Sequence, residues 1–139
     1  MSIKQIAVFL ENRQGRLSEL TETLGKAGVD LVALSIADTG EFGILRMVTR
    51  DNDHAVRVLR DAGYVVQVNS LIGVEVTDSA GGLSQMLKAL SGAGVDVDYL
   101  YSFAHTKRGT AVILFRVADE PRALAALQAN NIKTLKEII

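Results

Sequence analysis

A short loop near the N-terminus combines residue types that bind small anions. The stretch LENRQGRLSEL, residues 10–20, ends an alternating apolar segment and enters a segment with leucines at helical spacing. The first turn of a helix has unpaired N–H groups and a partial positive charge, which suit a carboxylate. Gly15 has no Cβ, so a ligand can approach the backbone there. The stretch is therefore either a strand-to-helix connection or a site for a small, negatively charged molecule.

A free amino acid offers both a carboxylate and an ammonium group. The N–H groups of Gly15, Arg16 and Leu17 suit the carboxylate, while the ammonium group needs an oxygen acceptor. Asn12, at the mouth of the loop, and Asp30, at the start of the next strand, are the candidate acceptors. Simpler roles are open for each: a turn or helix cap for Asn12, a turn for Gly15, and an exposed strand start for Asp30. We interpret Arg16 as a solvent-exposed helix residue.

The same pattern recurs 66 positions later. GRLSELTETLGKAGVDL begins at Gly15, and GGLSQMLKALSGAGVDV begins at Gly81. The chain is therefore a duplicated module of about 66–70 residues, with domains expected at 1–68 and 69–139. We expect the two copies to lose register only near their ends. The pairs that follow the spacing of 66 are Asn12 and Asp78, Gly28 and Gly94, Asp30 and Asp96, Gly43 and Gly109, and Arg50 and Arg116.

The apolar periodicity changes repeatedly within one copy. Alternation predicts strands at 3–10, 29–38, 44–50 and 64–68, and helical spacing predicts helices from Leu17 to Ala27 and after Asp53, a candidate N-cap. Such a βαββαβ unit forms a four-stranded antiparallel sheet with both helices on one face. The expected fold is therefore α+β, with two ferredoxin-like modules in tandem. The remaining sheet face is also largely apolar, which predicts a homodimer packed sheet to sheet.

The composition excludes several classes of function. The 139 residues include 15 basic and 16 acidic ones, which gives a net charge of −1 and does not favour nucleic acid or an anionic membrane. No apolar stretch is long enough to span a membrane, so we expect a cytoplasmic protein. The chain has no cysteine, and His54 and His105 lack the neighbours of a metal site or a catalytic group. We therefore expect no metal, no cofactor, no catalytic residues and no enzyme activity.

The two loops also resemble a known family. ENRQGRLSEL followed by LGKAGVDLVAL, and DSAGGLSQML followed by LSGAGVDVDYLYSF, are similar to the ACT-domain signature Asn-x-x-Gly-x-Leu, helix, Gly-Val-Asp and a strand. The resemblance covers essentially the whole chain, as two tandem ACT domains. Gln14 and Ala80 stand where the serine-binding regulatory domain of phosphoglycerate dehydrogenase has proline, so these loops should be less rigid.

The resemblance implies a regulatory protein that binds free amino acids between adjacent ACT domains and modulates a partner enzyme of amino-acid metabolism. The loop of one copy would then face strand residues of the other copy. The alternative is a subunit that has lost ligand binding and docks a separate enzyme. The expected ligand-binding residues are Leu10, Asn12, Gln14, Gly15, Arg16, Leu17, Asp30, Ser35, Ile36 and Ala37 in the first copy, and Asp78, Ala80, Gly81, Gly82, Leu83, Asp96, Tyr101, Ser102 and Phe103 in the second.

Overall fold

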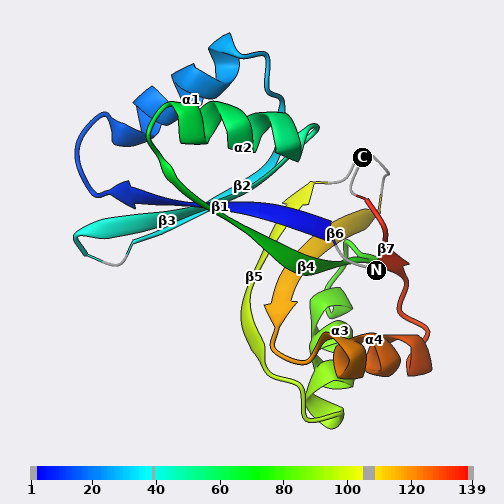
Figure 1. The fold of residues 1–139 in the computed structure, drawn as a ribbon. Helices are drawn as coiled ribbons and strands as arrows, with labels where there is room; N and C mark the ends of the chain where they lie inside the picture. Colours follow the sequence, from blue (N-terminus) through cyan, green and yellow to red (C-terminus); the bar gives the residue numbers. More distant parts are fainter. Residues whose placement is uncertain (1–2, 39, 105–108, 138–139) are drawn as a thin grey trace. The chain divides into compact units, whose positions relative to one another are not determined.

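The predicted order of helices and strands is present in both copies (Figure 1). The computed structural model describes residues 3–38, 40–104 and 109–137, with the backbone alone at 38, 103 and 104, so His105 lies outside the described residues. Within these residues the elements are β1 (Ile3–Glu11), α1 (Arg16–Lys26), β2 (Leu31–Asp38), β3 (Phe42–Thr49), α2 (Asn52–Asp61), β4 (Val65–Thr77), α3 (Gly82–Gly92), β5 (Val97–Ala104), β6 (Thr110–Val117), α4 (Glu120–Ala129) and β7 (Thr134–Leu135).

The strands form one sheet, which corrects the expectation of two separate four-stranded modules. Within the described residues the sheet has seven strands in the order β2-β3-β1-β4-β6-β5, and β7 also pairs with β4. The reason is β4, whose 13 residues serve as the last strand of the first copy and the first strand of the second. The chain divides into two compact units inside this strand, between Asn69 and Ser70.

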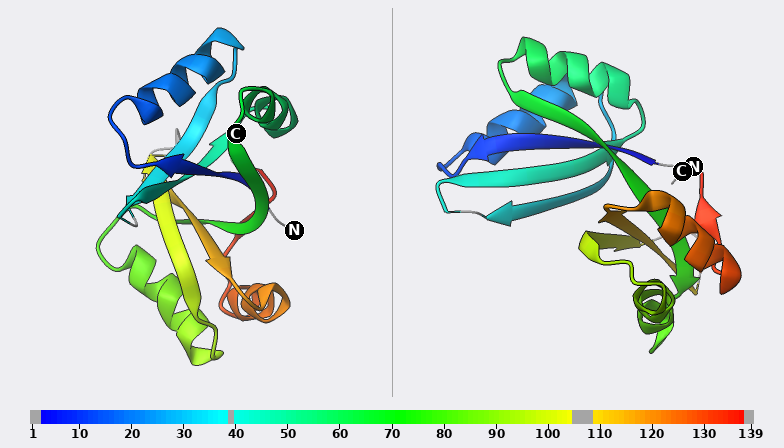
Figure 2. Two further views of the ribbon diagram at one scale, coloured as in Figure 1. Left: turned by 60° about the vertical axis from the view of Figure 1, so that its left-hand side comes forward. Right: turned by 60° about the horizontal axis from the view of Figure 1, so that its bottom comes forward.

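The first unit, residues 4–69, has one apolar core between its helices and its strands. Figures 1 and 2 show α1 and α2 on the same face of β1, β3 and β2. The predicted alternation is confirmed, because Ile6, Val8 and Leu10 face this core together with Leu45 and Met47. Each of these five side chains is at most 2% exposed. This packing fixes the C-terminal end of β1, from which the first loop begins.

The second unit has an equivalent core and includes the first described residue of the chain. Ile113 and Phe115 of β6 face α3 and α4, as the alternation of apolar residues predicts. By its contacts Ile3 also belongs to this unit. Its side chain lies against Gly73, where any Cβ would overlap the Ile3 Cδ1 atom. The glycine at position 73 therefore makes room for a side chain that comes from β1.

The constant spacing of 66 residues between the two copies ends earlier in the chain than the sequence suggests. Leu10 pairs with Gly43 in the first unit, whereas Val76, 66 residues after Leu10, pairs with Ala111 in the second. Two extra residues therefore lie between β5 and β6, and the structural counterpart of Gly43 is Ala111. The expected match of Gly43 with Gly109 is wrong, as is that of Arg50 with Arg116.

The second helix of each unit begins with an aspartate cap. Asp51, and not the predicted Asp53, caps α2, because its side chain accepts a hydrogen bond of 3.1 Å from the His54 N–H. Asp119 caps α4 in the same way through Arg122, and a proline lies in the first turn. Asp53 lies within the first turn of α2, where its negative charge interacts favourably with the helix dipole.

No helix in the described ranges is long and apolar enough to cross a membrane.

Candidate functional site

The first loop borders a cavity of about 280 Å³ within the first unit. This volume is near the lower end of the range of roughly 300–1,000 Å³ that is common for small-molecule pockets. Cationic and amide side chains lie on its loop side, and apolar side chains come from β1, α1 and β2. Its lining consists of Leu10, Glu11, Asn12, Arg13, Arg16, Leu17, Ile36 and Gly43. Five of the predicted ligand-binding residues are therefore brought together: Leu10, Asn12, Arg16, Leu17 and Ile36.

The helix that follows the loop begins without a side-chain cap. Gly15 takes the N-cap position with φ of 85°, in the left-handed region that glycine adopts most easily. The Arg16 N–H donates to the Arg13 carbonyl over 3.2 Å. Among the described residues, the N–H groups of Leu17 and Ser18 have no backbone acceptor outside the helix and no side-chain cap. The positive end of α1 is thus available to an anion.

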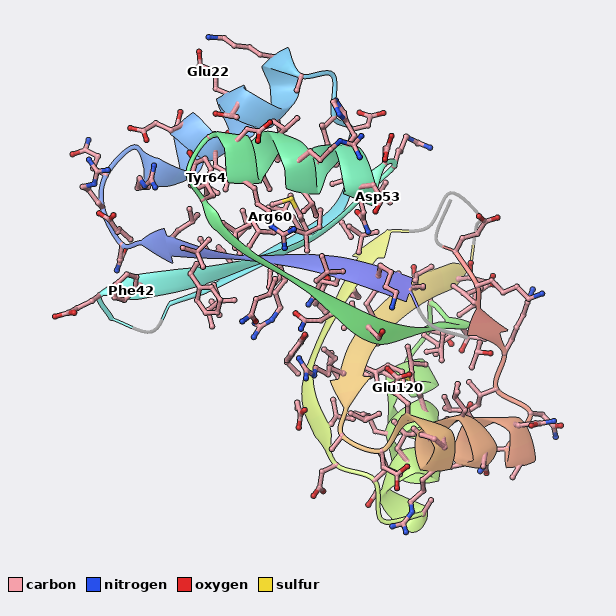
Figure 3. All side chains as sticks on the ribbon, viewed as in Figure 1. Glu22, Phe42, Asp53, Arg60, Tyr64 and Glu120 are labelled. Carbon is pink, nitrogen blue, oxygen red and sulfur yellow. The ribbon has the colours of Figure 1, made fainter. Side chains whose placement is uncertain are left out.

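Arg16 is held in place by two partners, so its interpretation as a solvent-exposed residue is wrong. Its Nη1 atom donates to Glu19 over 3.0 Å, and its guanidinium lies 4.7 Å from the centroid of the Tyr64 ring. Only 22% of the side chain is exposed, and its Nε atom is buried without a hydrogen-bond partner. Figure 3 shows Tyr64 near the N-terminal end of α1. The ring and the carboxylate therefore keep the cation at the cavity.

The charge of Arg16 is stable over the ordinary pH range. The hydrogen bond to Glu19 raises the pKa of Arg16 above its ordinary value, with a smaller contribution from Tyr64. An arginine is already cationic throughout neutral pH. The cavity therefore has a fixed positive charge beside the helix N-terminus.

Asn12 fixes the position of the loop. Its Nδ2 atom donates to the Gly40 carbonyl over 2.8 Å, and its backbone N–H donates to the Glu41 carbonyl over 2.8 Å. Both bonds tie the loop to the turn between β2 and β3. The N-cap of α1 is Gly15 and not Asn12, and the amide nitrogen of Asn12 is already used within the first unit.

Asp30 lies away from the loop within its own unit. It follows α1, whose 11 residues span about 16 Å at 1.5 Å per residue, whereas the loop precedes that helix. The Asp30 carboxylate accepts from Arg50 Nε over 3.1 Å, and its side chain is 75% exposed. Within the first unit, the carboxylate at the cavity is instead Glu11.

The three predicted strand residues of β2 separate between the two sheet faces. Ile36 pairs with Leu45, a core residue, and therefore points toward the helices and the cavity. Ser35 and Ala37, its neighbours, point to the opposite face. Gln14 is exposed in the loop and is not part of the cavity lining.

Three cavity residues were missing from the sequence prediction. Glu11 and Arg13 form an ion pair of 3.5 Å on the rim, with side chains 58% and 59% exposed. Gly43 lies in β3 opposite Leu10. A glycine inside a strand that is otherwise apolar was the available signal, since such glycines often mark a close approach of a ligand or a second backbone.

The second loop has the same backbone but different side chains. Gly81 is the N-cap of α3 with φ of 92°, again without a side-chain cap, so Asp78 does not cap the helix. Gly82, the counterpart of Arg16, is buried, and a Cβ there would overlap the Thr77 carbonyl oxygen. Ser79 stands in place of Arg13. This loop therefore lacks both arginines and has no room for a side chain at the first helical position.

The other predicted residues of the second copy lie in varied surroundings. Tyr101 is buried in β5, while its neighbour Ser102 is exposed on the opposite face. Leu83 is 37% exposed, the same fraction as its counterpart Leu17. The side chain of Phe103 lies outside the described part. The remaining residues are all exposed: Asp78, Ala80, Gly81 and Asp96.

The chain is similar to several solved structures. It shares 36% sequence identity with protein BT0572 from Bacteroides thetaiotaomicron, with a TM-score of 0.90 over 97% of this chain and 92% of that one. The ligand-free regulatory subunit of aspartate kinase from Thermus thermophilus is 12% identical, with a TM-score of 0.64 over 91% of both chains. The second likeness concerns the fold alone. No curated protein matches the chain.

The family model for an ACT domain pair matches residues 1–138. This match covers both loops, both helix pairs and the shared strand β4. The two copies of the βαββαβ order are thus the two domains that the model describes. The chain belongs to the ACT-domain family, as an ACT domain pair.

Proposed function

We propose that this chain is a regulatory protein that binds one free amino acid in the cavity at the first loop. The observation that carries the proposal is Arg16, which Glu19 and Tyr64 hold at a cavity beside an uncapped helix N-terminus. A cation and free N–H groups that converge on one small cavity suit a carboxylate. The family supports an amino acid as the source of that carboxylate.

The remaining lining suits the other parts of an amino acid. Glu11 provides a carboxylate on the rim for the ammonium group. This is the role that the sequence predicts for Asp30. Leu10, Leu17 and Ile36 provide an apolar wall for a side chain. The ligand would therefore be held by opposite charges at its backbone and by apolar contact at its side chain.

The regulatory part of the proposal concerns a partner enzyme. A ligand alters a partner only if it binds two states of the protein with different affinities. The fold is shared with chains described as regulatory subunits of aspartate kinase, which supports an enzyme of amino-acid metabolism as the partner. The competing role is docking to an enzyme without any ligand.

Calorimetric titration with each of the twenty amino acids tests this proposal. We expect at least one to bind at one site per chain, and Arg16→Ala to weaken that binding by about 10-fold or more, because a charged hydrogen bond is lost. Arg57→Ala, which changes an exposed arginine of α2, is the matched control and should bind normally. Absence of binding at millimolar concentrations of every amino acid would refute the proposal and favour ligand-free docking.

A further inference from the structure

Gly43 is a glycine that the backbone does not require. It lies within β3, and its φ is not among the positive values found at seven other glycines of the chain. It is paired with Leu10 in a regular antiparallel ladder. Strand interiors disfavour glycine, because it adds entropy to the unfolded chain and has no side chain to pack. Backbone conformation therefore gives no reason for glycine at this position.

Packing gives no reason either. A Cβ at position 43 would lie 3.5 Å from the Ala37 carbonyl oxygen and 3.5 Å from Ile36 Cδ1, which are ordinary van der Waals contacts. Position 43 differs in this respect from positions 73 and 82, where a Cβ would overlap Ile3 and Thr77. Position 43 therefore has room for a methyl group.

The second copy shows that the ladder accepts that methyl group. Ala111 is paired with Val76 as Gly43 is paired with Leu10, and both lie near the start of the equivalent strand. The same place in the same fold thus holds alanine in the copy whose loop lacks both arginines. Glycine is found in the copy whose loop lines the cavity of about 280 Å³.

The direction of a side chain at position 43 explains this difference. Its Cβ would lie 3.5 Å from Ile36 Cδ1 and 3.6 Å from Ile36 Cγ1, and Ile36 lines the cavity together with Leu10 and Leu17. A side chain here would therefore extend beside Ile36, which belongs to the apolar lining of the cavity. The apolar lining is the part that receives a ligand's side chain in the proposed orientation.

We infer that Gly43 determines the specificity of the site: it leaves open the space for the side chain of an aliphatic amino acid. This inference rests on the proposed function and adds the class of ligand to it. Amino acids with larger aliphatic side chains bind best, because they fill the space between Leu10, Leu17 and Ile36. Free glycine and alanine leave this space empty and bind more weakly.

The test is a calorimetric series with free glycine, alanine, valine, leucine and isoleucine, on the natural protein and on Gly43→Ala and Gly43→Val. We expect Gly43→Ala to weaken binding of the largest ligands by about 10-fold or more, as one methylene is discriminated in apolar pockets. Binding of free glycine should change less than twofold. Gly43→Val should abolish binding of the larger ligands. Gly25→Ala, at an exposed helical glycine with open space around it, is the control and should leave the series unchanged.

The possible outcomes separate the inference from the function it rests on. If the natural protein binds aliphatic amino acids and Gly43→Ala leaves their ranking unchanged, the inference is wrong and the binding function stands. An equal loss for every ligand, free glycine included, also refutes it, because that result means general damage to the site. If the natural protein binds no amino acid, the inference about Gly43 and the proposed binding function are both wrong. A thermal unfolding midpoint close to that of the natural protein shows that Gly43→Ala is folded, as Ala111 leads us to expect.

Discussion

At the scale of single residues, the candidate site depends on side chains that come together only in the folded chain. Arg16 and Tyr64 are 48 positions apart, and their contact places the guanidinium at the cavity. Lysine is not equivalent to arginine here, because a guanidinium stacks flat on an aromatic ring and donates from several atoms at once. The ring, the cation and Glu19 therefore act as one group.

Substitution Arg16→Lys tests this geometry. We expect ligand binding to fall by about 10-fold, close to the effect of Arg16→Ala, because the positive charge is retained but its orientation is lost. Tyr64→Phe keeps the ring and removes only the hydroxyl, whose hydrogen bond from Arg16 Nη1 is long at 3.5 Å, so it should bind nearly as well as the natural protein. Calorimetric affinities of the three variants provide the measurement. Full binding by Arg16→Lys would show that charge alone is sufficient.

Substitution Asn12→Asp tests the position of the loop. The amide nitrogen that donates to the Gly40 carbonyl becomes a carboxylate oxygen, which repels that carbonyl. We expect a loss of about 1 kcal/mol in the free energy of unfolding, typical of one hydrogen bond. Urea denaturation measures it, and Asn69→Asp provides an amide-to-acid comparison in β4, away from the loop. An unchanged midpoint would mean that the bond to Gly40 contributes nothing.

At the scale of helices and strands, the sequence predicts the element order well and the loop connections poorly. Leucines at helical spacing and alternating branched residues report local burial, so the helices and strands appear where expected. The cap of α2 was misplaced by two residues, since Asp51 and Asp53 are chemically identical. The register of β6 was misplaced because Gly109, a turn glycine with φ of 79°, is aligned by sequence with Gly43, a strand glycine. A glycine in the sequence does not reveal which of these two roles it has.

The aspartate cap is directly testable. Asp51→Ala removes the acceptor of the His54 N–H, and we expect a loss of about 1 kcal/mol in the free energy of unfolding. Asp53→Ala removes only a favourable interaction with the helix dipole and should cost less, about 0.5 kcal/mol. Chemical denaturation of both variants measures the difference. A larger effect at Asp53 would contradict the assignment of the cap.

At the scale of the whole molecule, β4 removes any linker between the two ACT domains. The sequence shows almost no linker, but the sharing of one strand of 13 residues became visible only in the hydrogen-bond ladders. Strand pairing over long separations cannot be read from local periodicity. The same holds for Ile3, which starts β1 and yet belongs to the second unit by its contacts.

Two isoleucines of β1 should report on different units. Ile3→Ala opens a cavity next to Gly73 and Leu114, and we expect a loss of about 2–5 kcal/mol together with faster amide exchange in residues 70–77 and 110–117. Ile6 lies in the core of the first unit, so Ile6→Ala should instead speed amide exchange in residues 16–26 and 42–49. Hydrogen exchange followed by mass spectrometry distinguishes the two patterns. If Ile3→Ala affected the first unit alone, its assignment to the second would be wrong.

The two extra residues between β5 and β6 make Ala111, and not Gly109, the structural counterpart of Gly43. In this chain one half has a strand glycine and two loop arginines, while the other has alanine at the equivalent place and small residues in its loop. The molecule therefore contains its own comparison: the second half has the same order of helices and strands as the first, without the two arginines and the glycine that line the cavity of the first.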